Sequence, residues 1–312
     1  MVAVAAASEA LGSLANSDVS LAPYCTYRVG GAAALFVEAR SVADLELVAA
    51  AVGVSSLPTL IVGKGSNLLV SDRGFPGVAV HLGADFEEIT IDTEAATVRA
   101  GGAALLPVAA RKSAAAGLTG FEWAVGVPGS IGGAVRMNAG GHGSDMAASL
   151  VRVTVFDLIE GAVQEWSLDD LQLAYRHSAL SAGHVVLFAE LQLADGDSVA
   201  ASEEISEIVR WRRENQPGGQ NAGSVFANPA GDSAGRLIDS LGLKGFRIGT
   251  AEVSPKHANF VQADPGGSAD DVYSLIREIR LRVATVTGIE LRVENRLIGF
   301  PDHPEVAGEH AT

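Results

Sequence analysis

The sequence has little cysteine and little positive charge. Cys25 is the only cysteine in 312 residues, which excludes an intrachain disulfide and a cysteine metal cluster and favours a cytoplasmic setting. Lysine and arginine number 22 against 37 aspartates and glutamates. The resulting net charge of −15 argues against binding to nucleic acid or to an anionic membrane surface. This net charge is still compatible with a local basic pocket for a phosphorylated ligand.

Metal-ligand spacing, long apolar runs and a signal peptide are also missing. The seven histidines include no His-x-x-x-His pair, so we expect no metal site. No apolar run reaches transmembrane length without polar or glycine breaks, so we expect no membrane insertion. The N-terminus lacks the positive charge of a signal peptide. Residues 301–312 show no periodicity, and we expect a disordered tail there.

What the chain does contain is a mixture of helical and strand patterns with room for about two domains. Short strands are predicted at 59–62 and 185–193, and amphipathic helices at 198–214 and 268–287. The composition changes at 194–197, which is the best domain boundary. The last apolar run, 289–299, predicts a strand that carries Glu294. These patterns favour an α+β fold.

The most unusual stretch is 126–143, which contains seven glycines. Such density marks places where the chain needs positive φ or where something comes very close. A Gly-rich surface linker is the alternative, but linkers lack residues such as Ile131, Val135 and Met137. The stretch therefore favours a loop with a short helical turn that wraps a cofactor and presents bare N–H groups to an anion or a flat ring.

A second glycine loop, Gly63-Lys-Gly-Ser-Asn67, follows directly after the predicted strand 59–62. Its backbone N–H groups suit a diphosphate. It is not a P-loop, because Pro58 occupies the position where that motif needs glycine. It is not a Rossmann fingerprint either, because the third glycine would fall on Leu68. Alone, this pentapeptide is a weak signal.

Four polar clusters on loops, helix ends or strand ends could carry chemistry, and each has a structural alternative. Arg176, at the end of a short extended piece, suits a carboxylate but could form a surface salt bridge. Arg212 and Arg213 end a helix, where cations ordinarily meet the helix dipole. Ser224 follows a glycine and has either an exposed hydroxyl or a role in an Asx/ST-type turn. Glu294 is either a buried acid or part of a solvated edge strand.

Taken together, these segments resemble the UDP-N-acetylenolpyruvoylglucosamine reductase family. Any one segment is weak, but ten in the right order, covering about residues 20–300, are highly specific. The matching segments are Thr26-Tyr-Arg-Val-Gly-Gly31, Val62–Asp72, Gly126–Ala134, Met137-Asn-Ala-Gly140, Ala174-Tyr-Arg-His-Ser178, Arg213-Glu-Asn-Gln-Pro217, Ala222-Gly-Ser-Val-Phe226, Gly242-Leu-Lys-Gly245, Ser254–Phe260 and Leu291-Arg-Val-Glu294.

The resemblance implies a fold and an activity. The fold would be a vanillyl-alcohol-oxidase/PCMH-type FAD domain over 1–195, with subdomains at about 20–80 and 81–195, followed by an α+β substrate domain over 196–300. The enzyme would use non-covalent FAD and NADPH to reduce a UDP-sugar enolpyruvyl ether in peptidoglycan precursor synthesis, as a cytoplasmic monomer. Another FAD oxidoreductase of this superfold, or a flavin- or nucleotide-binding protein without turnover, stays open as an alternative.

The resemblance also assigns roles to residues. Ser224 matches the proton donor, and Arg176 and Glu294 match two groups at the enolpyruvyl end. The expected substrate contacts are Tyr175, Arg213, Asn228, Lys256 and Asn259. The expected FAD contacts are Gly63, Lys64, Gly65, Ser66, Asn67, Leu68, Gly126, Pro128, Gly129, Ser130, Gly132, Gly133, Asn138 and Gly140.

The chain departs from the family pattern at several points. Ala227 stands where a lysine is expected, and Asn295 stands where an aliphatic residue is usual. The segment between Leu193 and Arg212 is too short for the tyrosine-bearing lid of one subclass, so the resemblance is to the lidless subclass. Because related oxidases attach flavin through His or Cys, His142 in the glycine stretch is a position to examine.

Overall fold

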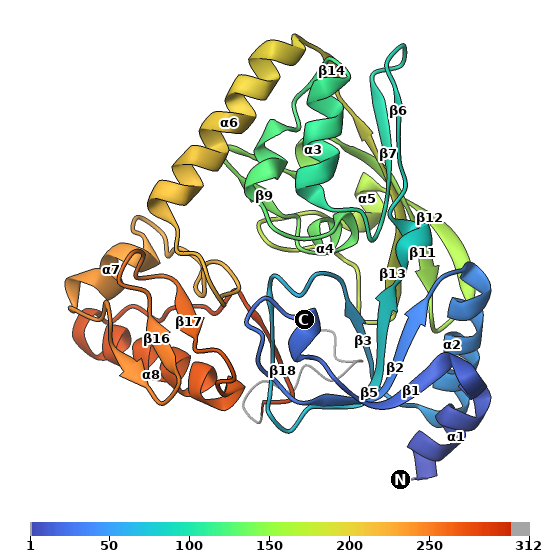
Figure 1. The fold of residues 1–312 in the computed structure, drawn as a ribbon, viewed down its shortest axis with the longest axis horizontal. Coiled ribbons are helices and arrows are strands. Elements are labelled where there is room, and N and C mark those ends of the chain that lie inside the picture. The colour runs from blue at the N-terminus through green and yellow to red at the C-terminus, as the bar shows by residue number, and fades with distance from the viewer. Residues whose placement is uncertain (1, 301–312) are drawn as a thin grey trace.

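The computed structural model describes residues 2–300 (Figure 1). Its first sheet has the order β1-β2-β5-β3. β1 (Ala15–Ser20) is antiparallel to β2 (Ala32–Ala39), whereas β2, β5 (Phe75–Leu82) and β3 (Thr59–Val62) run parallel. Two helices, α1 (Val2–Leu11) and α2 (Val42–Ser55), pack against each other beside the sheet. α2 begins where Ser41 and Asp44 form a capping box, which satisfies two N–H groups at its start.

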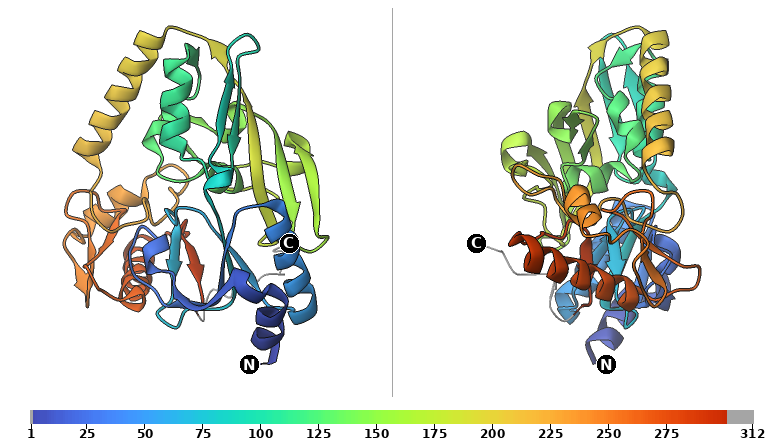
Figure 2. Two further views of the ribbon diagram at one scale, coloured as in Figure 1. Left: turned by 45° about the vertical axis from the view of Figure 1, so that its right-hand side comes forward. Right: turned by 90° about the vertical axis from the view of Figure 1, so that its left-hand side faces the viewer.

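The second sheet is antiparallel and has the order β12-β11-β13-β7-β6. α3 (Leu106–Ala115), α4 (Ile131–Arg136) and α6 (Ser198–Asn215) share one buried apolar cluster with it. α6 adds Ala201, Ile205 and Ile208 to this cluster, and Figure 2 shows the long helix beside α3. The strands are β12 (Ala162–Ser167), β11 (Leu150–Asp157), β13 (His184–Gln192), β7 (Thr97–Gly101) and β6 (Ile89–Asp92). The predicted boundary at 194–197 falls between β13 and α6, and the division into two domains stays a prediction.

The C-terminal part is a small sheet covered by helices. Its strands are β15 (Arg247–Ile248), β16 (Ala251–Val253) and β17 (Val261–Ala263), and its helices are α7 (Ala234–Ser240) and α8 (Ala269–Thr287). α8 buries the face that carries Val272, Ile276 and Ile279. In the described part of the chain, none of the helices has both the length and the apolar character needed to span a bilayer. Short elements complete the fold: β8 (Leu118–Thr119), β9 (Gly140–Gly141), β10 (Ser144–Asp145), α5 (Leu168–Leu171) and β14 (Ala194–Asp195).

The final segment returns to the first part of the molecule. β18 (Arg296–Ile298) pairs in parallel with β4 (Leu68–Val70), directly after the loop 63–67. The predicted strand over 289–299 is therefore too long. Before β18 the chain makes only a single bridge, between Phe226 and Val293, so Glu294 lies in irregular structure. The reason is that successive residues pair with different partners, which prevents one continuous ladder.

Several sequence predictions are confirmed by these elements. The strand at 59–62 and the helices at 198–214 and 268–287 have the expected positions within one residue. The short helical turn in the glycine stretch is α4. β1 was not predicted, because its sequence Ala-Asn-Ser-Asp-Val-Ser is largely polar and four of its residues are exposed. The predicted disordered tail at 301–312 lies outside the described residues.

Asp72 joins the two parts of the fold by capping α8 from outside its own segment. Its carboxylate accepts hydrogen bonds from the Ser268 hydroxyl at 2.6 Å and from the N–H groups of Ala269 and Asp270 at 3.1 Å each. Asp72→Ala leaves these groups without their acceptor. We expect it to lower the free energy of unfolding by about 1–2 kcal/mol, measured by chemical denaturation. Glu46→Ala, an exposed change on α2, is the control; an equal effect of both variants would contradict the capping role.

Candidate active site

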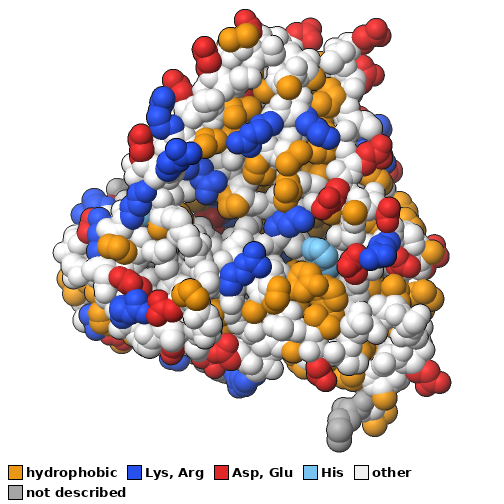
Figure 3. Space-filling model, viewed as in Figure 1, with side chains coloured by type: hydrophobic (Ala, Val, Ile, Leu, Met, Phe, Trp, Pro, Cys, Tyr) orange, Lys and Arg blue, Asp and Glu red, His pale blue; other side chains and the backbone are white. Residues whose placement is uncertain are grey.

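A cavity of about 490 Å³ lies where the two sheets and the C-terminal part meet. Its walls come from the loop after β3, from the glycine stretch before and after α4, and from the loop that follows α6. Figure 3 shows lysine and arginine side chains around the hollow on this face. A cavity of this size is in the range of small-molecule and cofactor sites.

The two glycine loops meet closely at one wall of the cavity. A Cβ atom on Gly63 would lie 2.6 Å from the Ser130 hydroxyl, and one on Gly65 would lie 2.1 Å from the Tyr24 carbonyl oxygen. Gly65 also has φ of +59°, a left-handed conformation. Gly65 therefore needs glycine, because a side chain there would clash with the backbone of Tyr24. A side chain at Gly63 would have to displace the Ser130 hydroxyl, which caps α4.

Several backbone N–H groups in these loops are available to a ligand. Within residues 2–300, the N–H groups of Lys64, Ser66, Gly129 and Ser130 have no acceptor. All four residues line the cavity. Adjacent unpaired N–H groups form an anion-binding concavity, so this wall suits a diphosphate.

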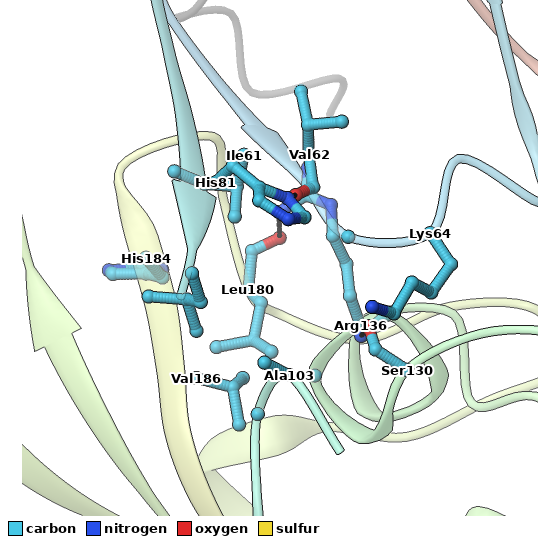
Figure 4. Close-up of a pocket in the computed structure, with 15 residues that line it drawn as sticks. Ile61, Val62, Lys64, His81, Ala103, Ser130, Arg136, Leu180, His184 and Val186 are labelled. Atoms are coloured by element: carbon cyan, nitrogen blue, oxygen red, sulfur yellow. Dashed lines mark hydrogen bonds between the residues drawn. The ribbon is translucent and has the colours of Figure 1, made fainter. Parts of the chain in front are cut away.

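A smaller cavity of about 70 Å³ continues from the main one and shares Gly63, Lys64 and Ser130 with it. Figure 4 shows residues from β3, β5, α4 and β13 around it. His81 Nδ1 lies 2.7 Å from the Val62 carbonyl oxygen, and Arg136 donates to the Leu180 carbonyl at 3.0 Å. His81 and Arg136 were not predicted from the sequence as cavity residues. Only their positions in the sequence could have indicated them. His81 lies in the parallel strand β5, and Arg136 is the last residue of α4.

Arg176 and Glu294, which are 118 residues apart in sequence, form an ion pair at the cavity wall. Arg176 Nε donates to Glu294 Oε1 at 2.5 Å, and Arg176 Nη2 donates to the Gly140 carbonyl at 3.1 Å. The side chains are only 25% and 14% exposed. The predicted extended piece at Arg176 is in fact a tight turn, bridged between Ala174 and His177, in which Arg176 has φ of +55°. That turn aims the guanidinium into the cavity.

Ser224 lies on the facing loop, next to the same pair. Glu294 N–H donates to the Val225 carbonyl at 2.8 Å, so the residue after Ser224 is bonded to the backbone of Glu294. The alternative role for Ser224, in an Asx/ST-type turn, is taken by Asn221. The Asn221 Oδ1 atom accepts a hydrogen bond from Gly223 N–H at 3.1 Å. The Ser224 hydroxyl itself has no partner within the described part of the chain. It is therefore free to contact a ligand.

Of the two neighbouring arginines on α6, Arg212 faces the cavity and Arg213 is exposed. Arg212 Nε donates to Gln216 Oε1 at 2.9 Å, and among the described residues no carboxylate pairs with it. Burial lowers the pKa of the Arg212 guanidinium. The backbone carbonyl oxygen of Arg213 accepts a hydrogen bond from Lys256 Nζ. Of these two arginines, Arg212 is therefore the one that presents its charge to the cavity.

The other expected substrate contacts do not line the cavity. Tyr175 is 59% exposed, and Lys256 is exposed as well. Asn228 Oδ1 accepts from the N–H of Ala234 at the start of α7. Asn259 is buried and binds both backbone groups of Phe226, at 3.0 and 2.8 Å. Their contact with substrate stays a prediction.

Most of the expected cofactor residues line the main cavity. Gly132 instead lines the smaller one. Asn138 lines neither, because its buried side chain binds Asp145, the Ala174 carbonyl and the Ala147 N–H. His142 is exposed and lies edge-on to Trp211, 5.2 Å between ring centres. The residues on the main cavity are Gly63, Lys64, Gly65, Ser66, Asn67, Leu68, Gly126, Pro128, Gly129, Ser130, Gly133 and Gly140.

Comparison with known proteins gives concordant matches over nearly the whole chain. Residues 33–167 match the FAD binding domain family, and residues 215–298 match the C-terminal domain of UDP-N-acetylenolpyruvoylglucosamine reductase. The reductase of that name from Heliobacterium modesticaldum is 43% identical over 279 residues, 88% of each chain. That from Synechococcus sp. RCC307 is 41% identical over 287 residues, 91% of this chain and 94% of its own. The crystal structure of the Thermus caldophilus enzyme superposes with a TM-score of 0.78 at 35% identity, covering 90% of this chain and 98% of that one.

Proposed function

The chain belongs to the UDP-N-acetylenolpyruvoylglucosamine reductase family, and from this premise we propose that Arg176, Ser224 and Glu294 carry out its chemistry in the main cavity. The enzyme reduces UDP-N-acetylenolpyruvoylglucosamine to UDP-N-acetylmuramate with NADPH and FAD, a step of peptidoglycan precursor synthesis. The observation that carries the proposal is the convergence of these three side chains, from three distant segments, at one cavity wall.

The cavity fits FAD. The free N–H groups of Lys64, Ser66, Gly129 and Ser130 would hold the diphosphate, and the close approach at Gly63 and Gly65 leaves no room for side chains there. When bound, FAD would supply the hydride chemistry that links NADPH to the enolpyruvyl double bond.

Arg176 stabilises the charge that develops on the substrate. A hydride added at the β-carbon of the enolpyruvyl ether leaves enolate charge conjugated with the substrate carboxylate. The Arg176 guanidinium, held by the Gly140 carbonyl and poorly exposed to water, is preorganised to meet this charge. Glu294 accepts a hydrogen bond from Arg176 Nε and so holds the guanidinium in place before substrate binds.

Ser224 completes the reaction by delivering a proton to the α-carbon. A hydroxyl is a poor acid in water, so its usefulness depends on placement against a developing carbanion. Its oxygen has no competing partner in the described structure, and its loop is bonded to the backbone of Glu294. Addition of one hydride and one proton converts the enolpyruvyl double bond to the lactyl ether. Ser224 then regains its proton from solvent.

The direct test of this function is anaerobic and follows flavin absorbance. The purified protein is reduced with one equivalent of NADPH, and UDP-N-acetylenolpyruvoylglucosamine is then added. We expect the oxidised flavin spectrum to return as UDP-N-acetylmuramate forms, which mass spectrometry detects. A flavin that stays reduced after the addition would overturn the proposed function.

Arg212, rather than Arg213, is the residue we expect to bind the substrate diphosphate. It lines the cavity, whereas Arg213 does not, and no carboxylate among the described residues pairs with it. A lost charge-assisted hydrogen bond that acts equally in ground and transition states raises KM alone. Arg212→Ala should therefore raise KM for the UDP-sugar about tenfold with kcat within about twofold. Arg213→Ala is the matched control and should leave both constants within about twofold; the reverse pattern would restore the assignment to Arg213.

The setting and assembly of the enzyme are also proposals. A cytoplasmic location is supported by the single cysteine, whose thiol is buried and whose pKa burial raises to about 12, so it is inert. A monomer is supported because Arg176, Ser224 and Glu294 meet within one chain. Light scattering checks the second point: a particle of 32.0 kDa is expected from the sequence.

A further inference from the structure

The side chain of Asn295 is a buried polar group between two residues that line the main cavity, Glu294 and Arg296. It is only 5% exposed and lies between Glu294 and the start of β18. Its Nδ2 donates to Asn67 Oδ1 at 2.9 Å and to the Ala222 carbonyl at 3.0 Å, with the Ser224 carbonyl at 3.4 Å. Its Oδ1 accepts from the Tyr27 hydroxyl at 3.3 Å. This one amide thus contacts four separate positions.

These contacts join the loops that carry the proposed cofactor and proton-transfer groups. Asn67, in the glycine loop 63–67, returns a hydrogen bond from its Nδ2 to the Glu294 carbonyl at 3.2 Å, and its own carbonyl accepts from Arg296 N–H at 2.8 Å. The carbonyls of Ala222 and Ser224 belong to the loop with the free hydroxyl. Asn295 therefore ties loop 63–67 to loop 221–226 beside the Arg176 ion pair.

The energetics favour a positional role. A buried amide gains little stability over a well-packed apolar side chain, because folding exchanges its hydrogen bonds with water for bonds within the protein. What the amide adds is direction, since each of its bonds fixes the distance between two backbones. An aliphatic residue of the same size would fill the space but leave the Ala222 and Ser224 carbonyls unheld. A loop that shifts by about 1 Å can cost about 10²-fold in rate.

We propose that Asn295 is a positioning residue that sets the Ser224 hydroxyl and the Glu294 carboxylate against the cofactor loop. It touches neither reacting atom and acts through the carbonyl of Ser224 and the side chain of Asn67. The inference rests on the proposed function of Ser224. It predicts that the amide matters for the transfer to substrate and not for the reduction of flavin by NADPH.

The test compares Asn295→Leu with Tyr27→Phe in anaerobic stopped-flow experiments on the FAD-loaded enzyme. Tyr27→Phe removes the hydroxyl's bonds to Asn295 Oδ1 and to the Ala222 backbone, but leaves the links from Asn295 Nδ2 to both loops intact. For Asn295→Leu we expect flavin reduction by NADPH within about twofold of the wild-type rate, and reoxidation by the UDP-sugar slowed about 10- to 100-fold. For Tyr27→Phe we expect both half-reactions within about twofold, with a lower unfolding midpoint.

A second readout does not depend on turnover. Hydrogen exchange of the N–H groups of residues 223–226, which exclude the Ala222 backbone that Tyr27 contacts, should accelerate in Asn295→Leu and stay near wild type in Tyr27→Phe. If Asn295→Leu fails to fold, Asn295→Thr, which keeps one donor, should show the same selective slowing in a smaller degree. Equal slowing of both half-reactions, or none, in the folded variant would overturn the inference. A wild-type enzyme that is not reoxidised by the UDP-sugar would instead overturn the proposed function.

Discussion

A Ser224→Ala variant is expected to be reduced by NADPH at the wild-type rate and to lose about 10³-fold in steady-state turnover. The hydroxyl is half-buried, faces the cavity and has no hydrogen-bond partner in the described structure. Its removal leaves no serine, cysteine or histidine among the residues that line the cavity on the same loop. Proton delivery to the α-carbon then depends on water that reaches a partly closed site. The measurement is reoxidation of the reduced flavin after addition of the UDP-sugar.

Two further variants separate proton donation from loop shape. Ser224→Cys places a more acidic group at nearly the same point, so it should recover part of the turnover that Ser224→Ala loses. Ser206→Ala removes a hydroxyl from the outer face of α6, where it only bonds the Ser202 carbonyl, and should change nothing. Normal reoxidation in Ser224→Ala, or equal losses in the alanine and cysteine variants, would remove Ser224 from the role of acid.

The cofactor loops were predictable from the sequence because their glycines mark them. Gly65 and Gly129 have positive φ, and Gly132 closely approaches the backbone of Gly102, so each of these positions favours glycine. The amphipathic helices were equally visible, since their apolar periodicity reports one buried face. The helical period also indicates which arginine faces inward. Arg212 follows Ile205 and Ile208 on the buried face of α6, whereas Arg213 lies one position off that face.

Arg176 and Glu294 could not be paired from the sequence by local rules. The pair forms only because the segment after α8 crosses back to β4, and nothing within either segment encodes that contact. The strand predicted around Glu294 was too long for the same reason. Val293 bridges to Phe226, whereas residues 296–298 pair with β4, so the run does not form one ladder. The resemblance to the family, not periodicity, identified these two residues.

Arg176→Ala is expected to lower kcat about 10²- to 10³-fold and to raise KM for the UDP-sugar. The variant loses the charge that faces the developing enolate. It also leaves the Glu294 carboxylate, which is 14% exposed, without its cation. That carboxylate then repels the carboxylate of the substrate, so part of the loss comes from Glu294 and not from the missing guanidinium. Steady-state kinetics at several UDP-sugar concentrations separates kcat from KM.

The double variant Arg176→Ala/Glu294→Gln distinguishes these two contributions. Because the added glutamine removes the repulsion, we expect its KM to fall back toward the wild-type value while kcat stays low. The combined loss in kcat/KM should therefore be smaller than the product of the single losses. The exposed pair Arg210 and Glu207 on α6, 3.7 Å apart, supplies the control, and its variants should act independently with little effect. Multiplicative losses at Arg176 and Glu294 would show that the two groups act separately on the substrate, and the ion pair between them would then be incidental to catalysis.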